Sequence, residues 1–277
     1  MYKTAYLTDK GLKRKMNEDA LLVADACGLF VIADGMGGHD RGEVASRIVV
    51  ESFQQMLCSD ENSTIAYTDM NPDNDETVSY FEDEDEEATV AYGNEMSNKT
   101  HLYNKLNKVV EASTQKIVTY TKEKRLSGQI GTTIAGLYEV KNEGEMALFH
   151  LGDSRVYRIR AFKIERLTTD HSKYEQMKQS GKYTEAELSK ISRNSITKAI
   201  GNFKVIPLEM SYVELQKDDI YILCSDGISD LIHASELLNF IKSNKNNLDE
   251  AIKQIKNLVY KRGAKDNLSI IIVRYEP

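Results

Sequence analysis

Three apolar segments that lie far apart in the chain each end in an aspartate with a glycine beside it. Short apolar runs bounded by turn residues are typical of strands that are buried on both faces. The pattern therefore requires a fold in which several buried strands end in carboxylates. The aspartates are Asp34 after residues 30–33, Asp153 after residues 148–152, and Asp226 after residues 220–225.

Acidic residues also stand directly before two predicted strands: Asp266 before residues 268–273, and Glu18 with Asp19 before the strand at Leu21. A single Asp-Gly pair usually marks only a turn. Carboxylates packed together at the ends of buried strands, however, repel one another unless protons or cations neutralise them. Because the chain has only three cysteines and five histidines, an oxygen ligand set favours Mg²⁺ or Mn²⁺ over zinc.

Two such ions would support phosphate chemistry. A pair of divalent cations about 3.5–4 Å apart, bridged by a carboxylate, generates a hydroxide nucleophile and clamps a phosphoryl group. Arg14 lies four residues before Glu18 and could bind the phosphate in a bidentate manner. The residues by themselves therefore predict a phosphate site built on hard metal ions.

Strands and helices follow one another in blocks rather than in a βαβ repeat, which favours an α+β layered fold. A hairpin is predicted over residues 21–33, and further strands over residues 132–140, 146–152, 155–160, 205–215, 220–224 and 268–275. Apolar stripes with helical spacing predict three helices. The stripes consist of Ala45, Ile48, Val49, Phe53, Met56 and Leu57, of residues 102–120, and of residues 248–259.

The net charge of −7 conceals a strong local asymmetry. Between Asp60 and Glu95 the chain has 13 acidic residues and no basic one, whereas the other 241 residues carry 36 basic and 30 acidic residues. A segment so charged cannot be buried, so residues 58–100 are predicted to be a solvated or disordered insertion between the first two helices. The mildly basic remainder excludes a strongly basic nucleic-acid-binding face.

Location and association are predicted from what the sequence lacks. No apolar run approaches the ~20 residues that cross a bilayer, and the N-terminus lacks the apolar core of a signal peptide. Three scattered cysteines, Cys27, Cys58 and Cys224, argue against a disulfide framework and for a reducing cytoplasm. Cys58 and Cys224 are interpreted as packing residues. We therefore expect one cytoplasmic domain over residues 1–277, acting as a monomer without membrane or nucleic acid.

Eight short motifs, in order, resemble those of the metal-dependent protein phosphatases, the type 2C serine/threonine family, in its compact bacterial form. The resemblance covers residues 11–274 and is interrupted only by the acidic segment. The motifs occupy residues 14–19 (RKMNED), 34–39 (DGMGGH) with 42–46 (GEVAS), 131–133 (GTT), 152–157 (GDSRVY), 167–172 (LTTDHS), 196–201 (ITKAIG), 224–227 (CSDG) and 266–269 (DNLS).

The resemblance implies a four-layer α-β-β-α sandwich, with two antiparallel sheets face to face, helices on both outer faces and the metal site at one end. It also implies a role for each residue that matches a motif position. Asp34 would bridge two Mn²⁺ or Mg²⁺ ions, and the Gly35 carbonyl would bind one of them. Asp226 and Asp266 would hold the first ion, Glu18 would reach the second through water, and Asp153 would contribute to a weaker third site. Asp19 would orient the nucleophile, and Arg14 would bind the substrate phosphate.

The implied reaction is attack of a metal-bridging hydroxide on phosphoserine or phosphothreonine monoesters of phosphoproteins, without a phosphoenzyme and in opposition to a protein kinase. One departure concerns the general acid, because Met36 stands where some members carry a histidine. A metal-bound water, or another group such as His39, must then protonate the leaving group. His39 is interpreted more readily as a loop-packing residue. Residues 171–201 resemble the family's flap, and its basic residues could dock phosphopeptides.

Two alternatives remain open. A protein with a phosphatase fold could bind phosphoproteins without turnover, but such proteins usually lose metal ligands, and every ligand position is filled here. The acidic segment could also recruit a basic partner or a kinase, in addition to either function.

Overall fold

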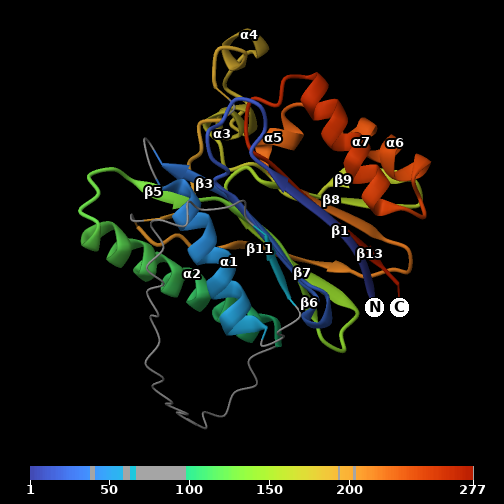
Figure 1. The fold of residues 1–277 in the computed structure, drawn as a ribbon, viewed down its shortest axis with the longest axis horizontal. Helices are drawn as coiled ribbons and strands as arrows, with labels where there is room; N and C mark the ends of the chain where they lie inside the picture. The colour runs from blue at the N-terminus through green and yellow to red at the C-terminus, as the bar shows by residue number, and fades with distance from the viewer. Residues whose placement is uncertain (38–40, 59–62, 67–97, 193, 202–203, 277) are drawn as a thin grey trace.

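Two antiparallel sheets form the centre of the molecule (Figure 1). The computed structural model describes residues 1–37, 41–58, 63–66, 98–192, 194–201 and 204–276. The five-stranded sheet has the order β1 (Tyr2–Asp9), β13 (Leu268–Tyr275), β12 (Ile220–Cys224), β8 (Arg155–Arg160) and β9 (Lys163–Arg166). The eight-stranded sheet has the order β10 (Ile200–Gly201), β5 (Ile130–Thr132), β3 (Leu29–Gly37), β6 (Ile134–Val140), β7 (Glu145–Leu151) and β11 (Glu209–Glu214), with β2 (Asp19–Ala24) on β3 and β4 (Thr64–Ala66) on β2.

Helices cover the outer face of each sheet. The long helices α1 (Gly42–Leu57) and α2 (Asn98–Glu123) pack on the eight-stranded sheet, and α6 (Ala234–Ser243) and α7 (Leu248–Lys261) pack on the five-stranded sheet (Figure 1). Three short helices, α3 (Lys173–Gln179), α4 (Glu185–Leu188) and α5 (Asp226–Ser229), and the 3₁₀ turn η1 (Asp25–Cys27) complete the described elements.

Three apolar layers hold these elements together. One lies between α1, α2 and the eight-stranded sheet, one between the five-stranded sheet and α6 with α7, and the third between the two sheets. Phe30, Leu137 and Tyr221 are among the fully buried side chains of the layer between the sheets. The predicted four-layer α-β-β-α sandwich is therefore confirmed.

The structure departs from the sequence-based prediction in several elements. Strand β1 was not predicted, because its polar residues and half-exposed position hide its alternation. The helix stripe was wrong at Met56, which is 40 % exposed, whereas Val50 is buried instead. The predicted strand over residues 132–140 is interrupted at Thr133, so it forms the separate strands β5 and β6.

The expectation of unpaired cysteines was wrong for two of the three. Cys27 and Cys58 form a disulfide with a Cα–Cα distance of 5.8 Å. Cys27 lies in η1 at the tip of the β2–β3 hairpin, and Cys58 directly follows α1. The packing of this hairpin tip against the end of α1 brings together residues that are 31 positions apart. Cys224 is free and buried in β12, in agreement with its predicted packing role.

The predicted acidic insertion over residues 58–100 lies mostly outside the described residues. Within that range, β4 pairs with β2 through Leu22 and Ile65, and α2 begins at Asn98. Among the helices that the structure describes, none is long and apolar enough to cross a membrane.

Candidate active site

The predicted carboxylates meet at one end of the sandwich because the strands that carry them end or begin there. Asp19 and Asp34 lie opposite each other in the β2–β3 pair. Asp226 follows β12 and Asp266 precedes β13, and these two strands are paired. Burial raises the pKa of Asp34, and the nearby charges of the other three aspartates and of Asp153 raise it further. The structure therefore brings all five predicted aspartates together.

Asp19 is anchored through one of its two carboxylate oxygens. The side chain is buried at 1 % exposure. Its Oδ2 accepts hydrogen bonds from Ser225 Oγ at 2.9 Å and Ser269 Oγ at 2.7 Å, while its Oδ1 has no hydrogen-bond partner among the described residues. Burial raises the pKa of Asp19 to about 6. The two serines fix the side chain and leave Oδ1 free to accept a further bond.

The backbone of Asp34 is held by the motif at residues 131–133. Its N–H donates to Thr133 Oγ1 at 3.1 Å, and its carbonyl accepts from Thr133 N and Thr132 Oγ1, both at 2.9 Å. Burial, followed by repulsion from Asp19 and Asp226, raises the pKa of Asp34 well above its usual value. Asp34 was predicted to follow its strand but lies within β3, which continues to Gly37 because Gly35–Gly37 pair with β5.

Gly35 lies where a side chain would not fit. A Cβ at this position would overlap the carbonyl oxygens of both Glu18 and Gly42. The Gly35 N–H donates to the Glu18 carbonyl at 3.0 Å, and Ser46 Oγ donates to the same carbonyl at 2.6 Å. The first turn of α1, the Glu18 backbone and the Asp34 strand therefore pack directly against one another.

Asp153 follows β7 and Asp226 follows β12, and both carboxyl groups have raised pKa values. Burial raises the pKa of Asp226 to about 8, and Asp153 is the next cause. Burial, followed by repulsion from Asp170, raises the pKa of Asp153 to about 6. Asp153 is 6 % exposed, and its Oδ1 has no hydrogen-bond partner among the described residues.

Arg14 stands at the rim of the cluster, with a side chain that is 49 % exposed. Its Nη2 donates to Asp266 Oδ2 at 2.8 Å, and its Nη1 lies 4.0 Å from Glu18 Oε2. Burial raises the pKa of Glu18, and the charge of Glu43 adds to that effect. The predicted phosphate-binding arginine is thus in contact with two predicted metal ligands.

Asn267 ties the segment that carries Glu18 to the start of β13. Its Oδ1 accepts from the Glu18 N–H at 2.9 Å, and its Nδ2 donates to the carbonyls of Lys10 and Met16 at 3.1 and 2.8 Å. The Asn267 side chain therefore fixes the position of the Glu18 backbone relative to the adjacent Asp266, although Glu18 and Asp266 are far apart in sequence.

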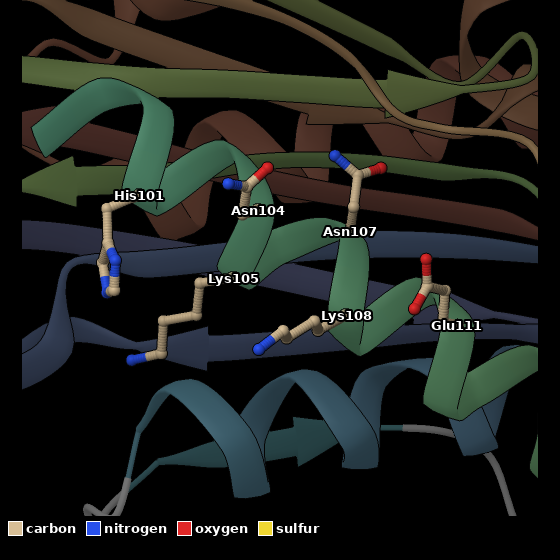
Figure 2. A pocket seen from close by; sticks show the side chains of 6 residues that line it. All are labelled: His101, Asn104, Lys105, Asn107, Lys108 and Glu111. Atoms are coloured by element: carbon tan, nitrogen blue, oxygen red, sulfur yellow. The ribbon is translucent and has the colours of Figure 1, made fainter. Parts of the chain in front are cut away.

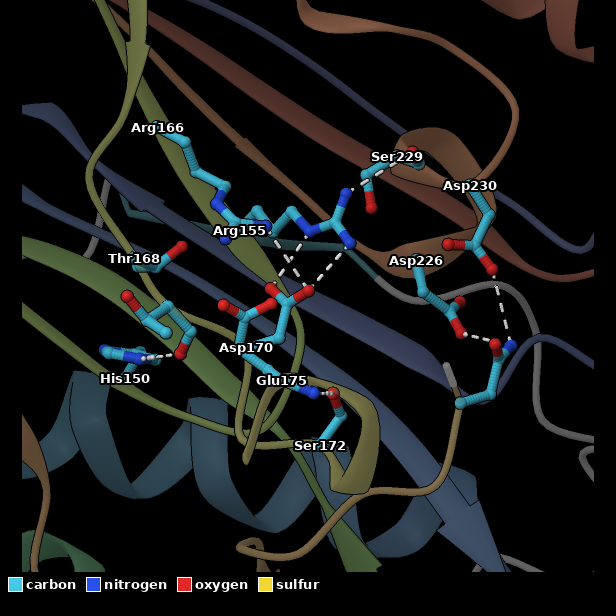
Figure 3. A network of polar contacts seen from close by, with 12 residues as sticks. His150, Arg155, Arg166, Thr168, Asp170, Ser172, Glu175, Asp226, Ser229 and Asp230 are labelled. Atoms are coloured by element: carbon cyan, nitrogen blue, oxygen red, sulfur yellow. Dashed lines mark hydrogen bonds and ion pairs between the residues drawn. The ribbon is translucent and has the colours of Figure 1, made fainter. Parts of the chain in front are cut away.

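A second polar network links the site to the flap (Figure 3). Arg155 forms a bidentate ion pair with Asp170, with distances of 3.0 and 2.7 Å. Asn194, from the end of the flap, places its Nδ2 3.5 Å from Asp226 Oδ2 and 3.4 Å from Asp230 Oδ2. The flap is therefore connected to a predicted metal ligand through an amide. Four of its predicted basic residues, Lys173, Lys178, Lys182 and Lys190, are exposed, and Arg193 lies outside the described residues.

The carboxylate cluster fits hard divalent cations. Buried oxygens of Asp19 and Asp153 lack partners in the described part of the chain, and buried polar atoms normally have them. The donors are oxygens, which Mg²⁺ and Mn²⁺ prefer. Close carboxylates also raise one another's pKa, because their charges repel, and a bound cation would relieve that repulsion.

Several residues that build the site were not assigned a role from the sequence. Ser225, Ser269, Thr133 and Asn267 all hold predicted site residues in place. Each lies inside one of the recognised motifs, and Ser225 and Asn267 directly adjoin an aspartate; that position was the available signal. Met36 lies in β3 and has no proton to donate, whereas His39 lies outside the described residues.

A hollow elsewhere on the molecule does not coincide with this site. It has a volume of about 580 Å³ and lies along the exposed face of α2 (Figure 2). None of the predicted ligands lines it. The lining residues are His101, Asn104, Lys105, Asn107, Lys108 and Glu111.

Comparison with known proteins identifies the family to which this fold belongs. The model of the protein phosphatase 2C family matches residues 12–269. Protein phosphatase PhpP of Streptococcus pneumoniae is 28% identical over 271 residues, which cover 96% of this chain and 95% of that protein. The crystal structure of the Mycobacterium tuberculosis serine/threonine phosphatase PstP/Ppp is 25% identical with a TM-score of 0.76, covering 100% of this chain and 99% of that chain.

A structure of the PstP catalytic domain in complex with two manganese ions is also similar, with 23% identity and a TM-score of 0.73, covering 100% of this chain and 99% of that chain. The present chain belongs to the protein phosphatase 2C family, whose members are metal-dependent serine/threonine phosphatases. The predicted family and class of enzyme are therefore confirmed.

Proposed function

We propose that the carboxylate cluster binds two Mn²⁺ or Mg²⁺ ions and that the protein uses them to hydrolyse phosphoserine and phosphothreonine monoesters. One observation carries the proposal: Asp19, Asp34 and Asp226 lie together with pKa values raised by burial and by one another. Hard cations relieve such repulsion. The similar fold of the PstP catalytic domain, which is in complex with two manganese ions, supports the same choice of metal.

The ligand assignments follow from the motif positions that these residues occupy. Asp34 would hold both ions, the Gly35 carbonyl one of them, Asp226 and Asp266 the first ion and Glu18 the second through water, and Asp153 would contribute to a weaker third site. Each residue named here lies at the same end of the sandwich.

The residues of this chain divide the chemistry between them. When bound, the two cations lower the pKa of a water and neutralise charge on the phosphoryl group. Asp19 keeps Oδ1 free beside Asp34, so that it can accept a hydrogen bond from the attacking water and orient it. Arg14, exposed at the rim, binds the substrate phosphate through its planar guanidinium. Its present contact with Asp266 shows that the guanidinium reaches the cluster.

The test is hydrolysis of an aryl phosphate and of a phosphothreonine peptide, with Mn²⁺ and with chelator. We expect Asp34→Asn to reduce turnover by roughly 10²–10³-fold or more, the loss seen when a group that stabilises the transition state is removed. The matched control is Asp218→Asn, which makes the same chemical change at an exposed turn with φ +67°, a conformation that asparagine accepts.

Each outcome discriminates between the hypotheses. Turnover that persists in chelator, or in Asp34→Asn, contradicts the metal assignment. A wild-type protein that binds Mn²⁺ and phosphopeptide without turnover would instead be a phosphopeptide-binding protein with a phosphatase fold.

We further propose that the substrates are phosphoproteins made by a serine/threonine protein kinase, and that the protein acts as a cytoplasmic monomer without nucleic acid. The substrate class supports the kinase. The Cys27–Cys58 disulfide removes the argument for a reducing compartment that rested on unpaired cysteines. Comparison of phosphoproteomes with and without the protein, together with fractionation and gel filtration, tests these statements.

The acidic segment is proposed to be an accessory to catalysis, because every proposed ligand lies outside residues 58–100. Replacing residues 69–95 by a short Gly-Ser linker should leave aryl phosphate turnover unchanged. A deletion variant that folds but is inactive would contradict this proposal.

A further inference from the structure

Two histidines and a glutamate form a polar cluster beside the carboxylate site. His150 lies in β7, Glu209 is opposite it in β11, and His171 is the first residue of the predicted flap. The two imidazole rings are buried and stacked, with centroids 4.6 Å apart and planes at 4°. None of these residues has a part in the proposed reaction.

Hydrogen bonds assign a proton to each ring. The Gly152 N–H donates to His171 Nδ1 at 3.1 Å, so Nδ1 carries a lone pair and the proton lies on Nε2, which donates to Glu209 Oε2 at 2.9 Å. Burial lowers the pKa of His171, which favours this neutral form. His150 Nε2 donates to the Thr169 carbonyl at 3.0 Å (Figure 3), and its Nδ1 has no partner among the described residues.

Two imidazoles and a carboxylate also make a familiar zinc ligand set, but this geometry does not fit one. A ring nitrogen binds a metal through a lone pair in the plane of its ring, and Zn–N distances are about 2.0–2.1 Å. Parallel rings stacked at 4.6 Å cannot both place such a lone pair on a single ion. In addition, Gly152 already occupies the lone pair of His171.

The cluster instead holds Gly152 at both of its backbone polar groups. The Gly152 N–H donates to the His171 ring, and the Gly152 carbonyl accepts from the His171 N–H at 2.8 Å. Gly152 has φ +108°, and a Cβ there would meet the Thr133 side chain at 2.6 Å. The residue is therefore confined between His171 on one side and Thr133 on the other, and Asp153 is the next residue in the chain.

His171 also joins the two ends of the flap. Its carbonyl accepts from Thr197 N at 2.7 Å and from Thr197 Oγ1 at 3.0 Å. The adjacent Ser172 forms an isolated bridge with Ile196. The same residue thus fixes the base of the flap and the backbone before Asp153.

We propose that His171, with its tautomer held by Glu209, is a positioning residue that couples the base of the flap to the Asp153 carboxylate and sets the affinity of the cation site to which Asp153 contributes. The inference rests on the proposed role of Asp153. Residues that orient metal ligands through hydrogen bonds change metal affinity by about 10–100-fold when they are replaced.

Two substitutions at the same position separate the interaction from general packing. In His171→Asn the amide oxygen takes the place of Nδ1 and can still accept from Gly152. In His171→Gln the amide lies near the place of Nε2, so the Gly152 N–H loses its acceptor. The matched control His101→Gln makes the same change on the exposed face of α2.

The measurements are amide hydrogen exchange at Gly152 in metal-free protein and calorimetric titration with Mn²⁺. We expect faster Gly152 exchange and about tenfold or greater weakening of the weakest Mn²⁺ site in His171→Gln, but wild-type exchange and most of the affinity in His171→Asn. In an Asp153→Asn background, His171→Gln should cause no further loss of Mn²⁺ affinity. Glu209→Ala should weaken the same site by a smaller factor.

Two results would overturn the inference. One is unchanged Gly152 exchange in His171→Gln, which would show that the ring does not hold this amide. The other is an equal loss of Mn²⁺ affinity with and without Asp153, which would assign His171 to general stability. Failure of the proposed function is distinguishable, because wild-type protein would then bind no Mn²⁺ at all while the Gly152 exchange still reported on His171.

Discussion

Strand β12 has an aspartate near each end, and the two carboxylates have opposite electrostatic surroundings. Asp219, before the strand, is 1 % exposed and accepts from Arg160 Nε at 2.7 Å and Nη2 at 2.5 Å, from Gln216 N at 2.9 Å and from Tyr221 Oη at 3.3 Å. Asp226, after the strand, is less buried but is faced by other carboxylates and by the distant amide of Asn194. Within the described part of the chain, only the first aspartate is paired with a basic side chain.

The difference distinguishes a structural charge from a functional one. A buried carboxylate is costly unless it is paired and hydrogen-bonded. At Asp219 the fold supplies a guanidinium, whereas the described groups that face Asp226 are other carboxylates and the Asn194 amide, so a bound cation can supply the balancing positive charge. Burial alone does not identify the functional residue, because Asp219 is more buried than the predicted metal ligand Asp226.

The largest expected effect is at the functional end of the strand. Asp226→Asn should reduce Mn²⁺-dependent turnover by roughly 10²–10³-fold, because it removes a ligand. In chelator the same variant should be more stable to urea than the wild type, because a repelled carboxylate has gone. Paired measurements of turnover and urea unfolding check this, and a variant that is both active and destabilised would break the comparison.

At the other end of β12, the same type of substitution should destabilise the protein rather than stabilise it. Asp219→Asn should lower the unfolding free energy by about 3 kcal/mol, because it leaves the Arg160 charge without its partner. Turnover of the folded fraction should stay near that of the wild type. Urea unfolding in the presence and absence of chelator gives the stability, and a loss of Mn²⁺ affinity here would mean that the two ends are not independent.

The disulfide gives a test of similar size at the hairpin tip, at the other end of β2 from Asp19. Cys58→Ser opens a loop of 31 residues and should lower the unfolding free energy by about 3 kcal/mol, through the entropy of the unfolded chain. Turnover should be unchanged. Thermal unfolding of the variant, with and without reductant, checks this, since reductant should destabilise only the wild type.

The smallest effect is a pH dependence that appears only without metal. The folded-state pKa values of Asp19 and Asp153 are about 6 and that of Asp226 is about 8, all above the usual 3.8. The native state therefore keeps protons that the unfolded chain releases, so this contribution to stability is complete below pH 4 and is lost as the pH rises through 6 and then 8.

In chelator we thus expect stability to fall between pH 6 and 8 by about 1.4 kcal/mol per pH unit for each retained proton. The fall should become shallower in Asp226→Asn and disappear in excess Mn²⁺. Urea unfolding at several pH values measures it, and a stability that rises over this range in chelator would contradict the repulsion on which the comparison rests.

The sequence predicted the features that depend on local pattern. Asp34 and Asp226 could be recognised because an apolar run shortly precedes each of them, although β3 continues past Asp34 to Gly37. The sheet order could not be obtained in this way. Strand β1 pairs along its whole length with β13, yet its own residues are too polar to predict a strand from the sequence.

Features that depend on long-range packing were missed. The disulfide forms because the β2–β3 tip meets the end of α1, and nothing in the spacing of Cys27 and Cys58 reveals that contact. The contacts of His171 were equally invisible, since Gly152 follows β7 and Glu209 begins β11, and only the completed sheet brings them to His171. Motif resemblance supplied the site residues but not the hydrogen bonds that hold them.

Helix α1 begins at Gly42, against Glu18, and spans 16 residues to Leu57. With a rise of 1.5 Å per residue its length is about 24 Å, so the chain leaves toward the acidic segment one full helix away from the proposed ligands. Natural selection can therefore lengthen, shorten or recharge that segment without disturbing the chemistry. Among relatives we expect residues 14–46 to diverge slowly and residues 59–97 to diverge fast, with α1 as the boundary between two rates of evolution.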